Sequence, residues 1–368
     1  MVMAMATERV MAMATKKAGD AMARTEKKKM SKGTKTLFIV VCVLVGLALL
    51  LAATVFTLSY IGRSSLTGDD TMKLPENADT SFESLGSGTI RRNGKLYRYN
   101  DEITCILLMG IDSYDKQSDG NYAPHQSDVN VLAVIDPKNE KLTLLSVSRD
   151  TLCELDIVDE NGNMTGTAEA QLALAYNYGG SDDESCRLTA TAVSRIFYGL
   201  NIPAYASIYM NGISDLVDIV GGVTVTPSDN FNGFAAGKQV ELKGNLTERY
   251  IRFRDYSVDG NNKRMQRQNQ VLKALVYKAL SVAKSDPTSV LDIYSSVQDN
   301  VTTNINTAMM IYLARQAVDL KYDGQILTVP GHSEMGEQDH AVFVIDEEAF
   351  LDQIIEIFYD QVKNEIPS

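Results

Sequence analysis

One uncharged, apolar run divides this chain in two. It lies between Lys35 and Arg63, and its apolar core from Leu37 to Leu58 is 22 residues long. A helix of that length can cross a hydrocarbon layer of roughly 30 Å, whereas a buried soluble helix so long would normally show a polar stripe. A cleaved signal sequence usually has an apolar region of only about 7 to 15 residues. We therefore expect one uncleaved transmembrane helix over residues 36–62.

The charges beside this run predict its orientation. Basic residues stay on the cytoplasmic side of a membrane, and a lysine cluster directly precedes the run: Lys27, Lys28, Lys29, Lys32 and Lys35. We expect residues 1–35 to form a cytoplasmic basic tail, because they are too few and too rich in Ala, Met and Lys to make a core. The rest of the chain is then extracytoplasmic, and the protein is a single-pass protein of the cell membrane.

The extracytoplasmic part divides by composition. Residues 63–100 are rich in Gly, Ser, Asp and Asn, which predicts a stalk with one short hairpin around Gly94. From Ile103 onward, apolar runs of strand length alternate with helical periods. The runs ITCILLMG, VNVLAVI and LTLLSVS are typical of strands that are buried on both faces. Strands mixed with helices on both sides predict a layered α/β domain over residues 101–368.

Periodicity also places the other elements of this domain. A further strand is predicted at 325–329, and helices are predicted at 169–178, 188–198, 263–284, 287–297, 307–320 and 346–363.

The charge balance limits the class of ligand. The chain carries a net charge of −12, and of its 35 Lys/Arg and 47 Asp/Glu only nine and three lie before Thr36, which leaves 26 and 44 after it. So acidic a protein does not bind nucleic acid by general attraction, because phosphate backbones need a broad basic face. Five arginines nevertheless occur in short motifs: Arg149, Arg252, Arg254, Arg264 and Arg267. A fold gains little from five fixed cations, so we expect a bound anion; pairing with Asp255, Asp259 and other carboxylates is the structural alternative.

The spacing of these arginines suggests shared faces. Tyr250, Arg252 and Arg254 alternate, so in an extended chain all three would point to one side. Positions i, i+3 and i+4 share one face of a helix: Arg264, Arg267 and Gln268. Cations in the first turns of a helix are disfavoured by roughly 0.3 to 1 kcal/mol each. A phosphate bound at the helix N-terminus and between the guanidinium groups would reverse that cost.

Acidic residues occur at the ends of the predicted strands. Asp112 follows the first run, Asp128 leads the second, and Arg149-Asp150 ends the third, which places all of them at one rim of the sheet. Taken singly, each aspartate fits a turn or cap equally well.

Cysteine and histidine exclude other chemistries. Cys42 lies in the apolar run and Cys105 in a strand, while Cys153 and Cys186 are a candidate bridge that spacing alone cannot establish. Only three histidines occur, without a paired motif such as H-E-x-x-H. We therefore expect neither a zinc site nor a Ser-His-Asp triad.

These motifs resemble a known family. The succession CILLMGID, QSDVNVLAVID, LTLLSVSRDT, AYNYGG, LVDIVGGVTV, YIRFRD and NKRMQRQNQVL is similar to the extracytoplasmic domain of the LytR-CpsA-Psr family over about residues 103–283. The resemblance implies a three-layer α/β/α fold with a mixed central sheet and a groove for a polyprenyl chain. It also implies transfer of lipid-linked glycopolymers, such as teichoic acid or capsule, onto peptidoglycan in Gram-positive-type envelopes.

The resemblance carries roles to particular residues. Asp112 and Asp128 correspond to the family's magnesium ligands. The diphosphate-binding arginines correspond to Arg149, Arg252, Arg254 and Arg264, with Gln268 as a further polar contact and Arg267 adjacent to the set. Arg149, Asp150, Arg252 and Arg254 are the residues expected to act in catalysis.

Two positions depart from the family pattern. Gln126 stands where the family commonly has Arg before Ser-Asp, and Tyr114 stands where an Arg often follows the first aspartate. The first change removes one expected diphosphate cation and leaves Gln126 as a neutral contact.

Phosphoryl transfer requires mainly positioning and neutralisation of charge, which magnesium on carboxylates and a guanidinium cluster supply. We expect Asp150 or a magnesium-side aspartate to take the proton of the attacking hydroxyl. Two alternatives remain: hydrolysis of the lipid diphosphate, and a non-catalytic binder or regulator that only holds it. The short basic tail does not support a regulator that reads DNA, because it has no apolar period for a helix-turn-helix core.

Overall fold

The computed structural model describes residues 53–68, 72–75, 82–112, 125–159, 161–253, 260–286, 289–336 and 341–362. The chain separates into a unit of residues 1–56 and a unit of residues 57–368, and the α/β domain is the second of these. Residues 53–66 are helical, while the expected tail and most of the expected span lie outside the described residues. Among the residues that are described, no helix is both long and apolar enough to cross a membrane.

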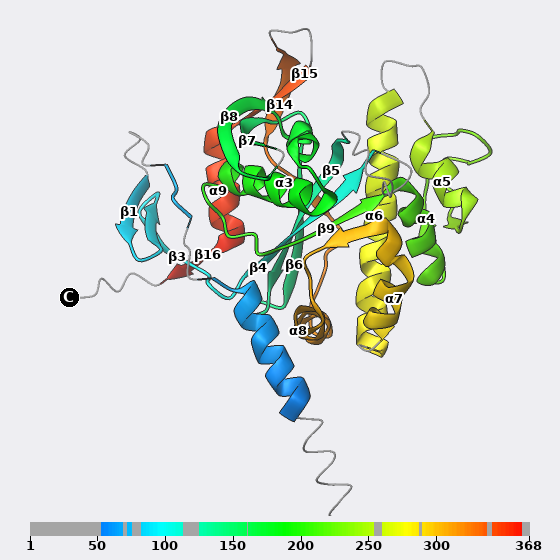
Figure 1. The fold of residues 1–368 in the computed structure, drawn as a ribbon, viewed down its shortest axis with the longest axis horizontal. Coiled ribbons are helices and arrows are strands. Elements are labelled where there is room, and N and C mark those ends of the chain that lie inside the picture. The colour runs from blue at the N-terminus through cyan, green and yellow to red at the C-terminus, as the bar shows by residue number, and fades with distance from the viewer. Residues whose placement is uncertain are drawn as a thin grey trace, which may run out of the picture. The chain divides into compact units, whose positions relative to one another are not determined.

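A six-stranded mixed sheet forms the centre of the domain (Figure 1). Its strand order is β12-β9-β4-β5-β6-β13. The pairs β4–β9 and β6–β13 are parallel and the other neighbours are antiparallel. The strands are β4 (Thr104–Ile111), β5 (Ser127–Asp136), β6 (Lys141–Val147), β9 (Ala204–Tyr209), β12 (Val301–Thr303) and β13 (Ile326–Thr328). The three apolar runs of the sequence are β4, β5 and β6.

Helices cover both faces of this sheet. Leu107 and Leu132 face a core shared with the 3-10 helix η1 (Leu172–Tyr178), α3 (Asp182–Ile196) and α9 (Glu347–Phe358). Ile106 and Val131 face the opposite core, which includes residues of α6 (Gly260–Ser285) and α8 (Thr307–Ala317). Successive side chains of a strand point to opposite faces, so a strand between two cores is apolar throughout. The three-layer α/β/α architecture is the one expected.

A third apolar core packs on the outer side of α6. It joins α6 to α4 (Met210–Ile219), α5 (Asn245–Arg252) and α7 (Ser289–Val297). The short hairpin β10 (Val223–Val225) and β11 (Val240–Leu242) completes it. The loop between these two strands contributes the stacked rings of Phe231 and Phe234 to this core.

Smaller sheets surround the central one. β1 (Phe82–Gly86), β2 (Thr89–Arg92) and β3 (Lys95–Tyr99) form an antiparallel sheet with β16 (Tyr359–Val362). The hairpin expected around Gly94 is the β2–β3 turn, where Asn93 and Gly94 have φ of 51° and 75°. Part of the expected stalk therefore belongs to a sheet whose edge strand is the C-terminal β16, which pairs with β3. The remaining hairpins are β7 (Leu152–Val158) with β8 (Met164–Gln171), and β14 (Gly331–Met335) with β15 (Ala341–Ile345).

Most predicted helices are present with shifted ends, as α3, α6, α7 and α8, followed after α7 by the 3-10 turn η2 (Gln298–Asn300). Three local predictions were wrong. Residues 164–171 form strand β8, because they pair with β7, so only Leu172–Tyr178 is helical. The last predicted helix ends at Phe358, where the chain pairs with β3. Tyr250 and Arg252 belong to helix α5 rather than to an extended segment, since Tyr250 and Ile251 pack into the third core.

Candidate functional site

The central strands bring the predicted acidic and basic residues to one rim of the sheet. β4 ends where antiparallel β5 begins, with Ile111 opposite Ser127, and β6 ends beside Asn130 of β5. The amide of Asp112 still donates to the carbonyl oxygen of Gln126 (3.1 Å). Asp112, Asp128 and Arg149 therefore lie at the ends of three adjacent strands, as the sequence predicted.

Asp128 is the buried centre of this rim. Its side chain is only 4% exposed, and its Oδ1 accepts a hydrogen bond from Nη1 of Arg149. Nη2 of Arg264, from the first turns of α6, lies 3.8 Å from the second oxygen, Oδ2. That oxygen accepts no hydrogen bond from the described part of the chain. A buried carboxylate oxygen without a donor is costly, so Oδ2 is suited to receive a cation.

Arg149 links three side chains of the rim. Its Nη2 donates to Oε1 of Gln126, and its Nε lies 3.5 Å from Oδ1 of Asp150. Gln126 was expected to contact substrate directly. In the structure its side-chain oxygen accepts a hydrogen bond from Arg149. An arginine at position 126 could not accept this bond, because a guanidinium has no acceptor.

Asp150 is held from a segment that the sequence did not associate with the site. Nε2 of Gln171 lies 3.4 Å from Oδ1 of Asp150 and also donates to the carbonyl of Ala341 (2.7 Å). The carbonyl of Asp150 accepts from the amide of Phe343 in β15 (2.8 Å). Burial raises the pKa of the Asp150 carboxyl, and the neighbouring Arg149 guanidinium partly offsets this. No local signal marked Gln171 or β15, because both reach the rim only through tertiary pairing.

Helix α6 connects the rim to the end of α5. Arg264 faces Asp128, and one turn later Nε2 of Gln268 lies 3.5 Å from the carbonyl oxygen of Ile251. Arg252 ends α5 and pairs with Glu248, one turn earlier, at 2.8 Å. An acidic residue at i−4 from an arginine is a signal that the sequence did offer. Arg254 and Tyr114 lie outside the described residues.

Arg267 is placed elsewhere, although it is only three residues from Arg264. Its side chain is 2% exposed, and its guanidinium lies among backbone carbonyls and the rings of Phe231 and Phe253. Arg267, which its spacing from Arg264 grouped with the diphosphate-binding residues, thus has its guanidinium inside the domain, while Arg264 faces Asp128.

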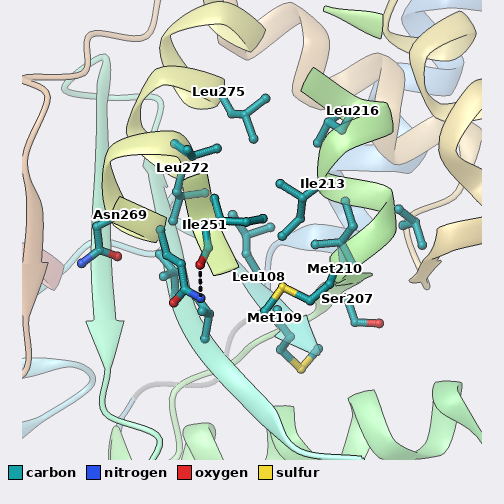
Figure 2. A pocket seen from close by; sticks show the side chains of 18 residues that line it. Leu108, Met109, Ser207, Met210, Ile213, Leu216, Ile251, Asn269, Leu272 and Leu275 are labelled. Atoms are coloured by element: carbon teal, nitrogen blue, oxygen red, sulfur yellow. Dashed lines mark hydrogen bonds between the residues drawn. The ribbon is translucent and has the colours of Figure 1, made fainter. Parts of the chain in front are cut away.

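An apolar cavity of about 290 Å³ begins beside the rim. Figure 2 shows its lining side chains, which come from β4, β5, β9, β12, α4, α5 and α6. Gly110 and Val129, the neighbours of the rim residues in β4 and β5, lie at its wall together with Gln268. The deeper wall is aliphatic: Leu108, Val131, Ile213, Leu216, Leu272 and Leu275. An apolar cavity next to buried charges is suited to an amphiphile with a charged head.

The donor set at the rim fits magnesium. Magnesium in proteins commonly takes one or two carboxylates and completes its shell with water and substrate phosphates. Asp112 is exposed at the end of β4, and Asp128 offers a buried oxygen to which no described residue donates a hydrogen bond. In the described ranges no group of three or more His, Cys, Asp or Glu could hold a metal ion. An ion at this rim would thus depend on ligand oxygens as well as on the two aspartates.

The cysteines take no part in this site. Cys105, Cys153 and Cys186 are free thiols, so the candidate pairing of Cys153 with Cys186 does not form.

Comparisons with known proteins agree with this architecture. A sequence model described as the LytR_cpsA_psr family matches residues 70–356. A relative from Enterococcus faecalis, named polyisoprenyl-teichoic acid–peptidoglycan teichoic acid transferase TagU, is 31% identical over 213 residues, or 56% of this chain and 63% of the relative. A protein of the same name from Oceanobacillus iheyensis is 27% identical over 329 residues, 88% of this chain and 94% of the relative.

Solved structures show the same fold. The crystal structure of protein gbs0355 from Streptococcus agalactiae has a TM-score of 0.56 and 26% identity, and the match covers 69% of this chain and 86% of that one. The crystal structure of B. subtilis TagV has a TM-score of 0.53 over 69% of this chain and 96% of that one, at 24% identity, a likeness of fold alone.

Proposed function

This chain belongs to the LytR-CpsA-Psr family, and from that membership and the geometry of its rim we propose that it is a glycopolymer phosphotransferase of the cell envelope. In this proposal the enzyme is anchored by the apolar run of residues 36–62. It takes a glycopolymer linked to a polyprenyl diphosphate, transfers it to peptidoglycan outside the membrane, and releases polyprenyl phosphate. The names of the relatives, which describe teichoic acid transfer to peptidoglycan, support the same class of reaction.

The observation that carries the proposal is the junction between the cavity and the rim. The aliphatic cavity reaches Gly110 and Val129, and Asp128 with its two neighbouring arginines follows directly. A polyprenyl diphosphate has the same division, because a long apolar chain ends in a compact, strongly charged head. The chain would enter the cavity and the diphosphate would lie at the rim.

The arginines of the rim would bind the diphosphate oxygens. Arg149 and Arg264 already lie against Asp128, and Arg252 is the last residue of α5. The resemblance to the family adds Arg254, which lies outside the described residues. Charge-assisted hydrogen bonds from guanidinium groups are among the stronger ones. A magnesium ion held by Asp112 and Asp128 would add neutralisation of the charge that develops on the phosphoryl oxygens.

The proposed transfer is a single displacement. A hydroxyl oxygen of the peptidoglycan acceptor forms a bond to the sugar-side phosphorus, and the bond from that phosphorus to the bridging oxygen breaks. Polyprenyl phosphate leaves with that oxygen, and the glycopolymer remains attached to peptidoglycan through a phosphodiester. The hydroxyl proton passes to a carboxylate. Asp150 is the better placed of the candidates, because its raised pKa makes it a stronger base than an ordinary aspartate and Gln171 holds its orientation.

The experiment that tests this proposal uses the full-length chain in lipid vesicles with a labelled polyprenyl-diphosphate glycopolymer, peptidoglycan and Mg²⁺. We expect labelled polymer on peptidoglycan and polyprenyl phosphate in equal amounts. Arg149→Ala should abolish both products, whereas Arg195→Ala, which removes an ion pair between α3 and Asp156 of β7, should not change them.

The other outcomes assign the other functions. Polyprenyl phosphate released without labelled peptidoglycan would identify a lipid diphosphate hydrolase. Tight binding of the lipid without either product would identify a non-catalytic envelope regulator. Either result would contradict the proposal that this protein is a glycopolymer phosphotransferase.

A further inference from the structure

We propose that Arg267 is a positioning residue that fixes the C-terminal end of α5 and thereby aims Arg252 at the diphosphate. This inference rests on the proposed function, because it gives Arg252 a diphosphate to bind. It assigns to Arg267 a role different from direct contact with the substrate.

Arg267 is buried in a way that excludes it from the rim. Its side chain is 2% exposed, the lowest exposure of any arginine that has an ion pair in the described ranges. Nε donates to the carbonyl oxygen of Tyr250 (3.2 Å), and Nη2 donates to that of Phe253. Nη1 lies 3.4 Å from Oδ1 of Asp229. All three nitrogens of the guanidinium are therefore engaged inside the domain.

Aromatic rings enclose the same guanidinium. Its central carbon lies 4.3 Å from the ring centroid of Phe231 and 5.5 Å from that of Phe253. These two rings stack at 4.9 Å, and Phe234 stacks on Phe231 at 4.8 Å. A cation over desolvated aromatic faces is held more firmly than an exposed one. The Arg267 cage, defined as Asp229, Phe231, Tyr250 and Phe253, joins α6 to the end of α5 and to the loop before β11.

The two carbonyls that Arg267 binds lie on either side of Arg252. Tyr250 is in the last turn of α5, and Phe253 is the residue at its C-terminal cap. The last carbonyls of a helix lack partners within the helix, and the planar guanidinium fork satisfies two of them at once. Lysine could not do this, because its ammonium is a compact point charge. The backbone at Arg252 is thus fixed from both sides.

The same helix also contacts the rim. Arg264 lies three residues before Arg267 on α6 and faces Asp128, and Gln268 contacts the carbonyl of Ile251. One rigid helix therefore contacts both the sheet rim and the end of α5. A binding group that is fixed before the ligand arrives loses less conformational entropy on binding. Loosening α5 at this point should weaken diphosphate binding through Arg252.

A double-mutant cycle on the full-length chain in nanodiscs tests this inference, with farnesyl diphosphate and Mg²⁺ as the probe and calorimetry as the measurement. Arg267→Lys keeps the charge but loses the fork, and we expect its affinity to fall about tenfold. Arg252→Ala should cause a similar loss. The double variant should bind farnesyl diphosphate no more weakly than Arg252→Ala alone, because the Arg252 guanidinium that Arg267 positions is then absent.

The background of Arg149→Ala provides the matched control. Arg149 is held by Asp128 and Gln126, independently of α5. Arg267→Lys should therefore still cost about tenfold in that background. A purely structural role would weaken binding equally in both backgrounds, and that result would overturn the inference, as would wild-type affinity in Arg267→Lys.

Two further cases must be distinguished: a variant that does not fold, and a wild-type protein that does not bind the probe. If Arg267→Lys does not fold, Asp229→Asn is the variant to use, because it removes only the carboxylate that pairs with Arg267. It should cause a smaller loss of affinity, and this loss should be absent in the Arg252→Ala background. A loss that persists there would overturn the inference. If the wild-type protein does not bind farnesyl diphosphate at all, the proposed function fails first, and the positioning role fails with it. If it binds but the cycle is additive, only the positioning role fails.

Discussion

Arg149 donates a hydrogen bond to the buried Oδ1 of Asp128, although 21 residues separate them in the chain. The antiparallel pair β5 and β6 brings the two residues together, because Asp128 lies at the start of β5 and Arg149 follows the end of β6. Because the other oxygen of Asp128 has no hydrogen bond among the described residues, this carboxylate can hold an arginine and still receive a metal ion.

The first prediction concerns topology. The lysine cluster before residues 36–62 should keep the tail inside and the domain outside the membrane. Protease added to intact, wall-stripped cells should therefore degrade the domain of residues 101–368. A cytoplasmic protein in the same cells provides the control for lysis. Full protection of the domain would contradict the assignment.

The second prediction concerns magnesium. Asp112→Asn should leave the domain folded, because Asp112 is exposed, yet it should abolish Mg²⁺-dependent turnover of a lipid diphosphate. Asp128→Asn should also release Arg149 from its ion pair, so it should lower stability as well as turnover. Turnover over a range of Mg²⁺ concentrations, with thermal unfolding of the same samples, measures both effects. Unchanged turnover of Asp112→Asn at limiting Mg²⁺ would refute the shared site.

The third prediction separates two arginines that are three residues apart. Arg264→Ala should weaken diphosphate binding about tenfold or more, since a charge-assisted contact contributes roughly 1.5 to 3 kcal/mol, while unfolding changes little. Arg267→Ala should instead destabilise the fold by roughly 1 to 3 kcal/mol for each of the two backbone carbonyls, of Tyr250 and Phe253, that loses its donor. Urea unfolding and calorimetric titration on both variants test the contrast. A reversal of the two patterns would mean that the residues are wrongly assigned.

The fourth prediction uses the neutral residue at position 126. Gln126→Arg should tighten binding of a polyprenyl diphosphate and make it more salt-sensitive, because it adds a cation. It should also lower the stability of the ligand-free protein, since the new side chain cannot accept from Arg149 and repels it. Gln126→Glu keeps the acceptor and adds a negative charge, so it should weaken binding. Calorimetric titration with a polyprenyl diphosphate at two ionic strengths tests this. Identical affinity and salt dependence in wild type, Gln126→Arg and Gln126→Glu would show that position 126 does not face the diphosphate.

The fifth prediction concerns pH. Burial raises the folded-state pKa of Asp150, so the native protein favours the protonated carboxyl. Its contribution to stability is therefore largest below the ordinary aspartate pKa and is lost as the pH rises through the raised value. Asp150→Asn should not lose stability in this way as the pH rises. In urea unfolding, the stability of the variant relative to wild type should therefore be greater at pH 7 than at pH 4. If Asp150 is the base, turnover should rise over the same pH window and be lost in Asp150→Asn. An unchanged difference in stability at the two pH values would contradict the shift.

The layered α/β architecture and the residues of the rim could be predicted from the amino-acid pattern alone. β4, β5 and β6 were recognisable because strands between two helical layers must be apolar on both faces. Asp112, Asp128 and Arg149 followed from this, since each stands at the end of such a strand. The free state of Cys153 and Cys186 and the strand β8 could not be predicted, because each depends on which segments come together in the fold.

Which arginines face the rim depends on contacts between distant segments of the chain. Arg264 and Arg267 lie on the same helix, and their spacing alone suggested a common role. The structure separates them because Arg267 meets Asp229 and Phe231, which come from a loop more than 30 residues earlier in the chain, whereas Arg264 meets Asp128. A buried guanidinium needs hydrogen-bond acceptors around it. At Arg267 distant segments supply carbonyls, a carboxylate and rings, and no local pattern in the sequence records that convergence.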